Sequence, residues 1–431
     1  MLLLLVITLI TFASCSAKDF FGDYSQYQDG TSSGEDEYLK GTNNCIFVYP
    51  INYYAQEGQN FTAKWQGMKK ALEQHGVTIT GDDSKDSKQF KYTISDDTDL
   101  PKDFQLVFVN NQTWDTSLAL SKPLKKYTPM AIVTTCNGVE FCSAQIMANS
   151  PNTRNCTLGG FSDAYQKAFE NGSLAYLGVK FAASVGPIVA ATYSAVQGAP
   201  IRTPEGGAIR IGQKYWMINS LEEYLELADL DVINDNPVYK KSDYDQIIPI
   251  TNPNATYEDF YNWAIASGIE DVRAKYEANR DTVCTPVTTE KFKIGLIVPG
   301  SINDAVQAYI DYITKYMAVM YNFEVVMYPV SSSVNQKAAT QQACDANCKA
   351  VISLQDDTDR NAAIEYANSR GVYSAIVGNS QNDNDYNQVK DLPYFVGSIG
   401  SGLQDEIDAE YEMVEYYLQK MIQRGEWTIS K

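Results

Sequence analysis

The sequence predicts an α/β fold with two lobes, each built on a doubly wound, Rossmann-like parallel sheet. Three observations predict it. Short apolar runs alternate with amphipathic segments in both halves of the 431-residue chain. The amphipathic segments are roughly 10–20 residues long, which is enough for a helix that returns the chain to the next parallel strand. Polar residues collect directly after several apolar runs, where parallel sheets place their binding loops.

The last third of the chain, residues 291–431, shows this alternation most clearly. Five apolar runs predict strands at Phe292–Pro299, Phe323–Tyr328, Ala350–Leu354, Val372–Val377 and Tyr394–Gly397. Helical spacing of apolar residues predicts helices at Ile302–Tyr321, Arg360–Ser369 and Leu403–Ile422. We expect this second unit to form one parallel sheet with helices on its faces.

A first unit of the same kind is predicted over residues 44–205. Its strands are expected at Cys45–Pro50, Val77–Thr80, Gln105–Val109, Met130–Thr134 and Leu174–Val179. Its helices are expected at Phe61–His75, Leu118–Tyr127, Asp163–Glu170 and Val185–Val196. Residues 206–290 are more mixed, and we expect closing strands and a helical connector there, with helices at Leu221–Ala228 and Tyr257–Asn279.

The N-terminus predicts export. Leu2–Ala13 is an apolar run too short to span a bilayer, so residues 1–17 are expected to be a signal peptide. Two processing routes stay open. Phe12-Ala-Ser-Cys15 resembles a lipobox, which implies a lipid on Cys15, and the small residues near Ala17 suit ordinary signal cleavage. Either route predicts an extracytoplasmic protein, secreted or lipid-anchored at the cell surface, with residues 18–43 as an acidic, disordered tether.

The net charge argues against two classes of partner, and the glycine-rich stretches do not match nucleotide-binding motifs. A net charge of −19 argues against nucleic acid and anionic membrane surfaces, which require basic patches. Gly207–Lys214 nearly matches a phosphate loop, but its lysine is one residue late and no Ser or Thr follows, so a turn and an edge strand are expected. Gly397–Gly402 lacks the dinucleotide spacing and predicts a tight strand-to-helix turn. No cofactor is expected.

The eight cysteines suggest disulfides in an oxidising compartment. Cys136 and Cys142 close a short loop, and Cys344 and Cys348 are four residues apart, so both pairs are candidate disulfides. A metal site is the weaker alternative, because neither pair has two-residue spacing and the chain has a single histidine.

Catalysis has little support in the sequence. The single histidine, His75, ends an amphipathic helix beside Gly76, where a C-terminal capping role is expected. Carboxylate pairs such as Asp383 and Asp385 are expected on solvated faces of an acidic chain. The chain is therefore predicted not to be an enzyme.

Several segments resemble a known family when taken in order. In the second unit they are Lys293–Pro299, Ala362–Val372 and Tyr394–Ser398, and in the first unit Ala63–Leu72 and Glu170–Leu174. Both units are similar to lobes of the type I periplasmic binding protein superfamily, in particular its simple-sugar and basic-membrane-lipoprotein branches. The lobe that usually comes second stands first here. This departure leaves open whether the two units form one complete cleft or are incomplete modules.

The resemblance implies a ligand site between the lobes, on loops at the strand ends. The candidate ligand-binding residues there are Tyr53, Lys64, Asn111, Trp114, Asn137, Asn303, Asp304, Asp356, Asp357 and Asn379. Lys64 stands where the resembling families often place an arginine, and Trp114 could stack on a sugar face.

These observations together predict an exported solute-binding protein. It is expected to capture a small polar ligand, a sugar or nucleoside, for transport or sensing, with a membrane transporter or receptor as partner. One alternative is a receptor-like or adhesion ectodomain that recognises a protein or peptide. A secreted hydrolase that uses a carboxylate pair is a third hypothesis, which no paired motif supports.

Overall fold

The structure is a computed structural model of the whole chain. It describes residues 43–49, 67–75, 79–80, 93–94, 105–108, 120–121, 124–125, 128–134, 138–231, 238–279, 290–355 and 359–423. The expected signal peptide, Cys15 and the acidic tether lie outside these residues. Among the described helices, none is both long enough and apolar enough to cross a membrane.

A six-stranded sheet forms the first lobe, in the order β4-β1-β5-β6-β7-β9. Its strands are β1 (Asn43–Tyr49), β4 (Gln105–Phe108), β5 (Pro129–Thr134), β6 (Arg154–Gly159), β7 (Leu174–Val179) and β9 (Trp216–Ile218). All neighbouring strands are parallel except β9, which pairs antiparallel with β7. Every residue of β7 is buried, as expected for a parallel strand covered on both faces.

A second six-stranded sheet forms the second lobe, in the order β11-β10-β12-β13-β14-β8. Its strands are β8 (Ile209–Gly212), β10 (Phe292–Val298), β11 (Phe323–Pro329), β12 (Ala350–Ser353), β13 (Tyr373–Asn379) and β14 (Phe395–Ser401). All its strand pairs are parallel. The predicted fold class, α/β with two parallel-sheet lobes, is therefore confirmed.

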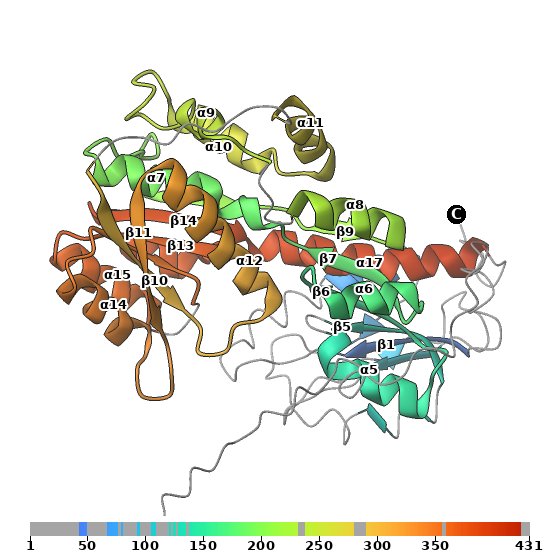
Figure 1. Cartoon of the computed structure of the whole chain (residues 1–431). Helices are drawn as coiled ribbons and strands as arrows, with labels where there is room; N and C mark the ends of the chain where they lie inside the picture. Colours follow the sequence, from blue (N-terminus) through green and yellow to red (C-terminus); the bar gives the residue numbers. More distant parts are fainter. Residues whose placement is uncertain are drawn as a thin grey trace, which may run out of the picture.

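The helices cover the faces of the two sheets (Figure 1). Those that follow strands of the first sheet are α5 (Gly138–Asn149), α6 (Asp163–Glu170), α7 (Gly186–Val196) and α8 (Leu221–Asp231). The connector contains α9 (Lys241–Asp245), α10 (Tyr257–Ile265) and α11 (Ile269–Asn279). The second unit contributes α12 (Asp304–Tyr312), the π-helical turn η3 (Ile313–Met317), α13 (Ala318–Met320), α14 (Gln336–Asp345), α15 (Arg360–Ser369), α16 (Asp383–Val389) and α17 (Leu403–Gln423).

The two lobes exchange helices. After β7 of the first lobe, the short 3-10 helix η2 (Ala182–Val185) leads into α7, which lies against β13 and β14 of the second lobe. After β14 of the second lobe, α17 runs back and lies against β5 and β7 of the first lobe, as the long red helix in Figure 1 shows. Since each sheet is covered by a helix from the other unit, the two units form one two-lobed body.

The residue patterns of the exchanged helices explain this packing. Every residue of α7 from Gly186 to Ala195 is buried, and a helix that is apolar all round needs partners on all sides. In α17, Met413, Tyr417 and Leu418 are fully buried at helical spacing, and Tyr416 stacks on Tyr176 of β7 with ring centroids 4.8 Å apart. Burial of such side chains typically contributes about 1.5–3 kcal/mol each.

Strand β8 also changes lobes. It pairs with β14 at the edge of the second sheet, and the chain then returns to the first sheet as β9. The edge strand expected at Gly207–Lys214 is thereby confirmed.

A tight turn was predicted over Gly397–Gly402, but β14 continues through Ser401. The turn prediction was wrong because these glycines serve close strand packing: Gly397 has φ of 140°, and a Cβ there would overlap the Ile209 backbone oxygen of β8.

Two smaller expectations change in the first lobe. The strand predicted at Val77–Thr80 appears as β2 (Ile79–Thr80), which pairs with β3 (Thr93–Ile94) in a separate two-stranded sheet. His75 contacts α17 as well as ending its own helix, since its Nε2 atom lies 2.7 Å from Glu415 Oε2.

The predicted Cys344–Cys348 disulfide is not formed, and both residues are free thiols. Each thiol is buried in a small apolar cluster under β10 and α14, and Cys348 Sγ lies 3.8 Å from the Tyr328 hydroxyl. Burial raises the pKa of Cys344 to about 11, which keeps the thiol protonated and unreactive near neutral pH. Cys142 is buried in α5, and its expected partner Cys136 lies outside the described residues.

Candidate functional site

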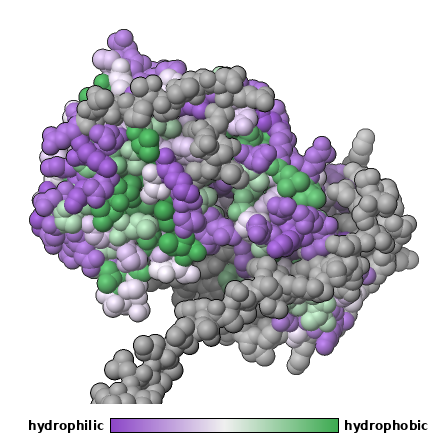
Figure 2. All heavy atoms as spheres, viewed as in Figure 1, coloured by the Kyte–Doolittle hydropathy of each residue, from purple (hydrophilic) through white to green (hydrophobic). Residues whose placement is uncertain are grey.

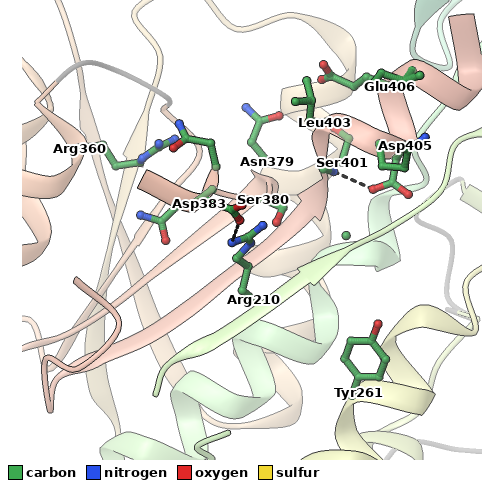
Figure 3. Close-up of a pocket in the computed structure, with 16 residues that line it drawn as sticks. Arg210, Tyr261, Arg360, Asn379, Ser380, Asp383, Ser401, Leu403, Asp405 and Glu406 are labelled. Atoms are coloured by element: carbon green, nitrogen blue, oxygen red, sulfur yellow. Dashed lines mark hydrogen bonds and ion pairs between the residues drawn. The ribbon is translucent and has the colours of Figure 1, made fainter. Parts of the chain in front are cut away.

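An open cavity of about 760 Å³ lies at the carboxyl ends of β13, β14 and β8 (Figure 3). The first turns of α17 and the side chain of Tyr261 from α10 complete its walls. Ligand pockets in α/β proteins occur at such strand ends, and this volume is within the range of small-molecule sites. The cavity also adjoins the point where α17 leaves the second lobe for the first.

Polar side chains at the end of β13 form one wall of the cavity. Asn379, Ser380 and Gln381 follow one another there, and Ser401 ends the neighbouring strand β14. Gln381 is 2% exposed, and its Nε2 atom donates to Asn361 Oδ1 at 3.3 Å. Its Oε1 atom is buried and accepts no hydrogen bond from any described residue. A buried acceptor without a donor is costly, so this wall suits a ligand that brings a hydroxyl or amide hydrogen.

The two arginines that line the cavity are each paired with a carboxylate. Arg210 Nη1 of β8 lies 2.6 Å from Asp383 Oδ1, and Arg360 Nη2 of α15 lies 2.6 Å from Asp385 Oδ2. The side chain of Arg360 is only 8% exposed, so its ion pair is held in place by the surrounding protein. Because their charges are matched, these arginines can donate hydrogen bonds to a ligand without creating a strongly anion-selective site.

The start of α17 forms a second wall. The Gly402 backbone N–H donates to Asp405 Oδ2 at 2.8 Å, which satisfies one of the unpaired donors at the helix N-terminus. A Cβ at Gly212 on β8 would lie only 2.7 Å from that same oxygen. The absence of a side chain at Gly212 thus keeps this part of the cavity open.

Hydrogen bonds join three of the connections between the lobes beside the cavity. Lys180, directly after β7, donates through Nζ to the backbone oxygen of Gln213, and its ammonium lies 4.7 Å from the centre of the Tyr215 ring. The Tyr215 hydroxyl donates to Ser401 Oγ at 3.1 Å. The carboxyl ends of β7, β8 and β14 are therefore linked at one place. We call this place the hinge, because the chain passes between the lobes there.

Burial lowers the pKa of Lys180 to about 7, although Asp405 and Glu406 act to raise it. A lysine pKa near neutral pH is unusual, because an exposed lysine stays charged to about pH 10. The charge at the hinge is therefore coupled to the carboxylates at the start of α17.

The first lobe faces the second across α12. A Cβ at Gly160, after β6, would touch the Cβ of Ala305 in α12 at 3.0 Å. Burial raises the pKa of Glu140 in α5, Asp304 raises it further, and a hydrogen bond of 2.7 Å from the Tyr165 hydroxyl opposes the shift. Like charges from both lobes thus approach each other at this contact.

The structure describes three of the ten predicted ligand-binding residues. Asn379 lies on the cavity wall. Asn303 caps α12, with its Oδ1 atom accepting from the Val306 N–H at 2.9 Å, and Asp304 begins that helix facing the first lobe. The other candidates lie outside the described residues: Tyr53, Lys64, Asn111, Trp114, Asn137, Asp356 and Asp357. Their roles stay predictions.

Several cavity residues were not found by reasoning from the sequence. Arg210 is in the glycine-rich stretch interpreted only as an edge strand, and Asp383 was assigned to a solvated face. Tyr261 comes from the connector. No local sequence pattern indicates that the connector lies over the strand ends. Asp405 could have been found, because it stands three residues after Gly402 at the start of a long predicted helix, where an acidic side chain is common.

A second cavity of about 670 Å³ lies near the amino end of β10 and includes Lys291, Lys293 and Lys349. All three lysines are exposed. Exposed lysines without a buried polar partner do not define a ligand site, and this end of a parallel sheet seldom holds one.

The chemistry of the first cavity fits a small neutral ligand with several hydroxyl groups. It offers donors from paired arginines and serine hydroxyls, acceptors from amides and carboxylates, and the buried Gln381 Oε1 atom, which accepts from none of the described residues. A hydroxyl group both donates and accepts, so it can use all of these groups at once.

Comparison with known proteins agrees with the fold. No family model and no curated protein matches the sequence. Solved structures of the type I periplasmic binding protein fold do match. An ABC-transporter solute-binding protein from Burkholderia graminis, in complex with D-arabinose, has 10% identity and a TM-score of 0.45, over 90% of this chain and 92% of that one. A carbohydrate transporter protein from Acidothermus cellulolyticus with myo-inositol has 10% identity and a TM-score of 0.43, over 89% and 88%.

A regulator matches as well. A protein from Brachyspira murdochii described as an ABC transporter, LacI family transcriptional regulator, has 10% identity and a TM-score of 0.39, over 90% of this chain and 91% of that one. At these identities and scores the likeness concerns the fold and carries nothing about the ligand.

Proposed function

We propose that this chain is an exported, non-enzymatic solute-binding protein that captures a small, neutral, polyhydroxylated ligand, a sugar or nucleoside, between its lobes. The observation that carries the proposal is the cavity of about 760 Å³ at the strand ends, with paired arginines and the unsatisfied Gln381 Oε1 atom in its walls. A transporter or a membrane receptor is the proposed partner.

The hinge supports capture by closure. The hydrogen bonds of Lys180 and Tyr215 link three of the connections between the lobes, those at the ends of β7, β8 and β14. Rotation about a few such residues can bring the first lobe over the cavity, as in other two-lobed binding proteins. A ligand that contacts both lobes then stabilises the closed state in proportion to its added contacts.

A thermal-shift screen of the full chain against sugars, nucleosides, amino acids and short peptides tests the proposal. A ligand at about 100-fold over its dissociation constant adds roughly 2.7 kcal/mol to the free energy of unfolding, which raises the melting temperature by several degrees. We expect the rise only with sugars or nucleosides. A rise with peptides alone favours the receptor-like alternative, and turnover of a glycoside panel favours a hydrolase. A folded protein that responds to no probe contradicts the proposal.

A further inference from the structure

Tyr261 is a large side chain presented to the cavity by a well-anchored helix. Helix α10 begins at a capping box, in which Thr256 Oγ1 accepts from the Asp259 N–H at 3.1 Å and Asp259 Oδ2 accepts from the Thr256 N–H at 2.9 Å. The neighbouring Phe260 is fully buried in the main core. Tyr261 itself is 38% exposed and lines the cavity.

The same helix is fixed to the hinge. Gln213 lies in the connection between β8 and β9, and its Nε2 atom donates to the backbone oxygen of Ala264 at 3.1 Å and to that of Ser184 at 3.2 Å. Gln213 is 2% exposed, so both bonds are shielded from water. The position of α10 is thereby set by the residues that join the two lobes, and Tyr261 is held at a defined place beside the cavity.

The cavity has an apolar side and a polar side. Tyr261 and Leu403 are large apolar residues left 38% and 44% exposed, and both line the cavity. Figure 3 shows Tyr261 standing apart from the other labelled side chains, across the open space from Arg210 and Asp405. The amides and hydroxyls of Asn379, Ser380 and Gln381 belong to the other wall. A flexible polyol needs only the polar wall, whereas a ring with an apolar face and hydroxyl edges can use both.

We infer that Tyr261 is a specificity-determining residue that stacks on the apolar face of a cyclic ligand, so that the cavity selects rings over open-chain polyols. The inference rests on the proposed function and names the ligand class more narrowly. The tyrosine ring supplies the contact, because stacking depends on the π-face and its dispersion contacts. Its hydroxyl is not needed for this role. Both a pyranose and a nucleobase offer a suitable face.

Calorimetric titration of matched ring and open-chain pairs tests the inference. The ring and open-chain pairs are D-glucose with sorbitol, D-galactose with galactitol, and D-xylose with xylitol, and adenosine is compared with D-ribose to separate a nucleobase from a sugar ring. We expect the wild-type chain to bind at least one cyclic probe about tenfold more tightly than its partner. The Tyr261→Ala variant is expected to lose this preference, and Tyr261→Phe to keep it. A larger loss for adenosine than for ribose identifies a base as the stacked ring, and the reverse identifies a sugar.

Ile265→Ala serves as the matched control. Ile265 is 42% exposed on the same helix and does not line the cavity, so its truncation should leave every affinity unchanged. If the wild type binds sugars but Tyr261→Ala keeps the preference for rings, the inference is wrong and the proposed function stands. If the wild type binds no probe of either kind, the proposed function fails and the inference fails with it.

Discussion

Replacing Gly397 with alanine is expected to lower the free energy of unfolding by roughly 3–5 kcal/mol. Two costs combine at this position. The φ angle of 140° is unfavourable for any residue with a Cβ, and that Cβ would overlap the backbone oxygen of Ile209 in β8. Backbone atoms of a paired strand cannot move aside as a side-chain end can. The substitution should therefore separate β8 from β14 and loosen the second sheet at its edge.

Gly206→Ala isolates the conformational cost. Gly206 has φ of 87°, but a Cβ there meets nothing within 4 Å, so we expect a loss of only about 1–2 kcal/mol. Urea denaturation followed by circular dichroism and by tryptophan fluorescence measures both variants. Equal losses for Gly397→Ala and Gly206→Ala contradict the close pairing of β8 with β14, and with it the crossing of this strand between lobes.

Replacing Gly212 with leucine is expected to weaken ligand binding by about 100-fold or more while the fold is kept. Gly212 is exposed at the cavity, and its backbone conformation suits any residue. A leucine side chain there would project toward Asp405 and occupy space that the ligand requires. Calorimetric titration with the best ligand of the thermal-shift screen measures the affinity, and circular dichroism checks the fold.

Gly212→Ala is the graded control for this prediction. Its Cβ would lie 2.7 Å from Asp405 Oδ2, which is the end of a side chain and can shift by a few tenths of an ångström. We expect it to change affinity several-fold at most, because the cavity stays open. A Gly212→Leu variant that binds as tightly as the wild type contradicts the placement of the ligand in this cavity.

The alternation of strands and helices in the second unit could be predicted from the sequence for a physical reason. Strands buried on both faces read as short continuous apolar runs, and Ala350–Ser353 was found in this way. Helix α15 begins and ends as predicted, because an amphipathic segment is followed by Gly371, which takes φ of 67° after the last turn. Local pattern and local structure agree at these elements.

Polar elements were harder to predict. β6 is entirely buried except its last residue, yet its sequence Arg154-Asn-Cys-Thr157 contains few apolar residues. Helix α14 is similarly polar, and α16 begins with an Asn382 cap in a stretch interpreted as solvated carboxylates. These elements are buried by segments that lie beside them in space but far away in the sequence. Local periodicity carries no information about such contacts.

The exchange between the lobes also lies beyond local pattern. The sequence predicts α7 and α17 as helices, but a helix carries no signal for which of two similar sheets it covers. Only the fully buried surface of α7 indicates that it needs partners on every side. The candidate site depends on this exchange, since Arg210, Tyr261 and Asp405 meet only after β8, α10 and α17 have reached the strand ends.

Hydrophobic residues on the face in Figure 2 gather over the second lobe, and Val319 and Met327 are among the most exposed apolar side chains described. They belong to α13 and the edge strand β11, away from the cavity. Ligand binding is therefore not expected to change their surroundings directly, which makes these elements an internal reference for hydrogen exchange.

Hydrogen exchange of the full chain, with and without a saturating ligand from the screen, tests whether the ligand binds in the cavity at the strand ends. We expect slower exchange at 379–383 and 401–407, where β13 ends and α17 begins, and unchanged exchange at β11. Protection confined to 290–293 and 346–349, beside the lysine-lined cavity, would place the ligand elsewhere and contradict capture between the lobes.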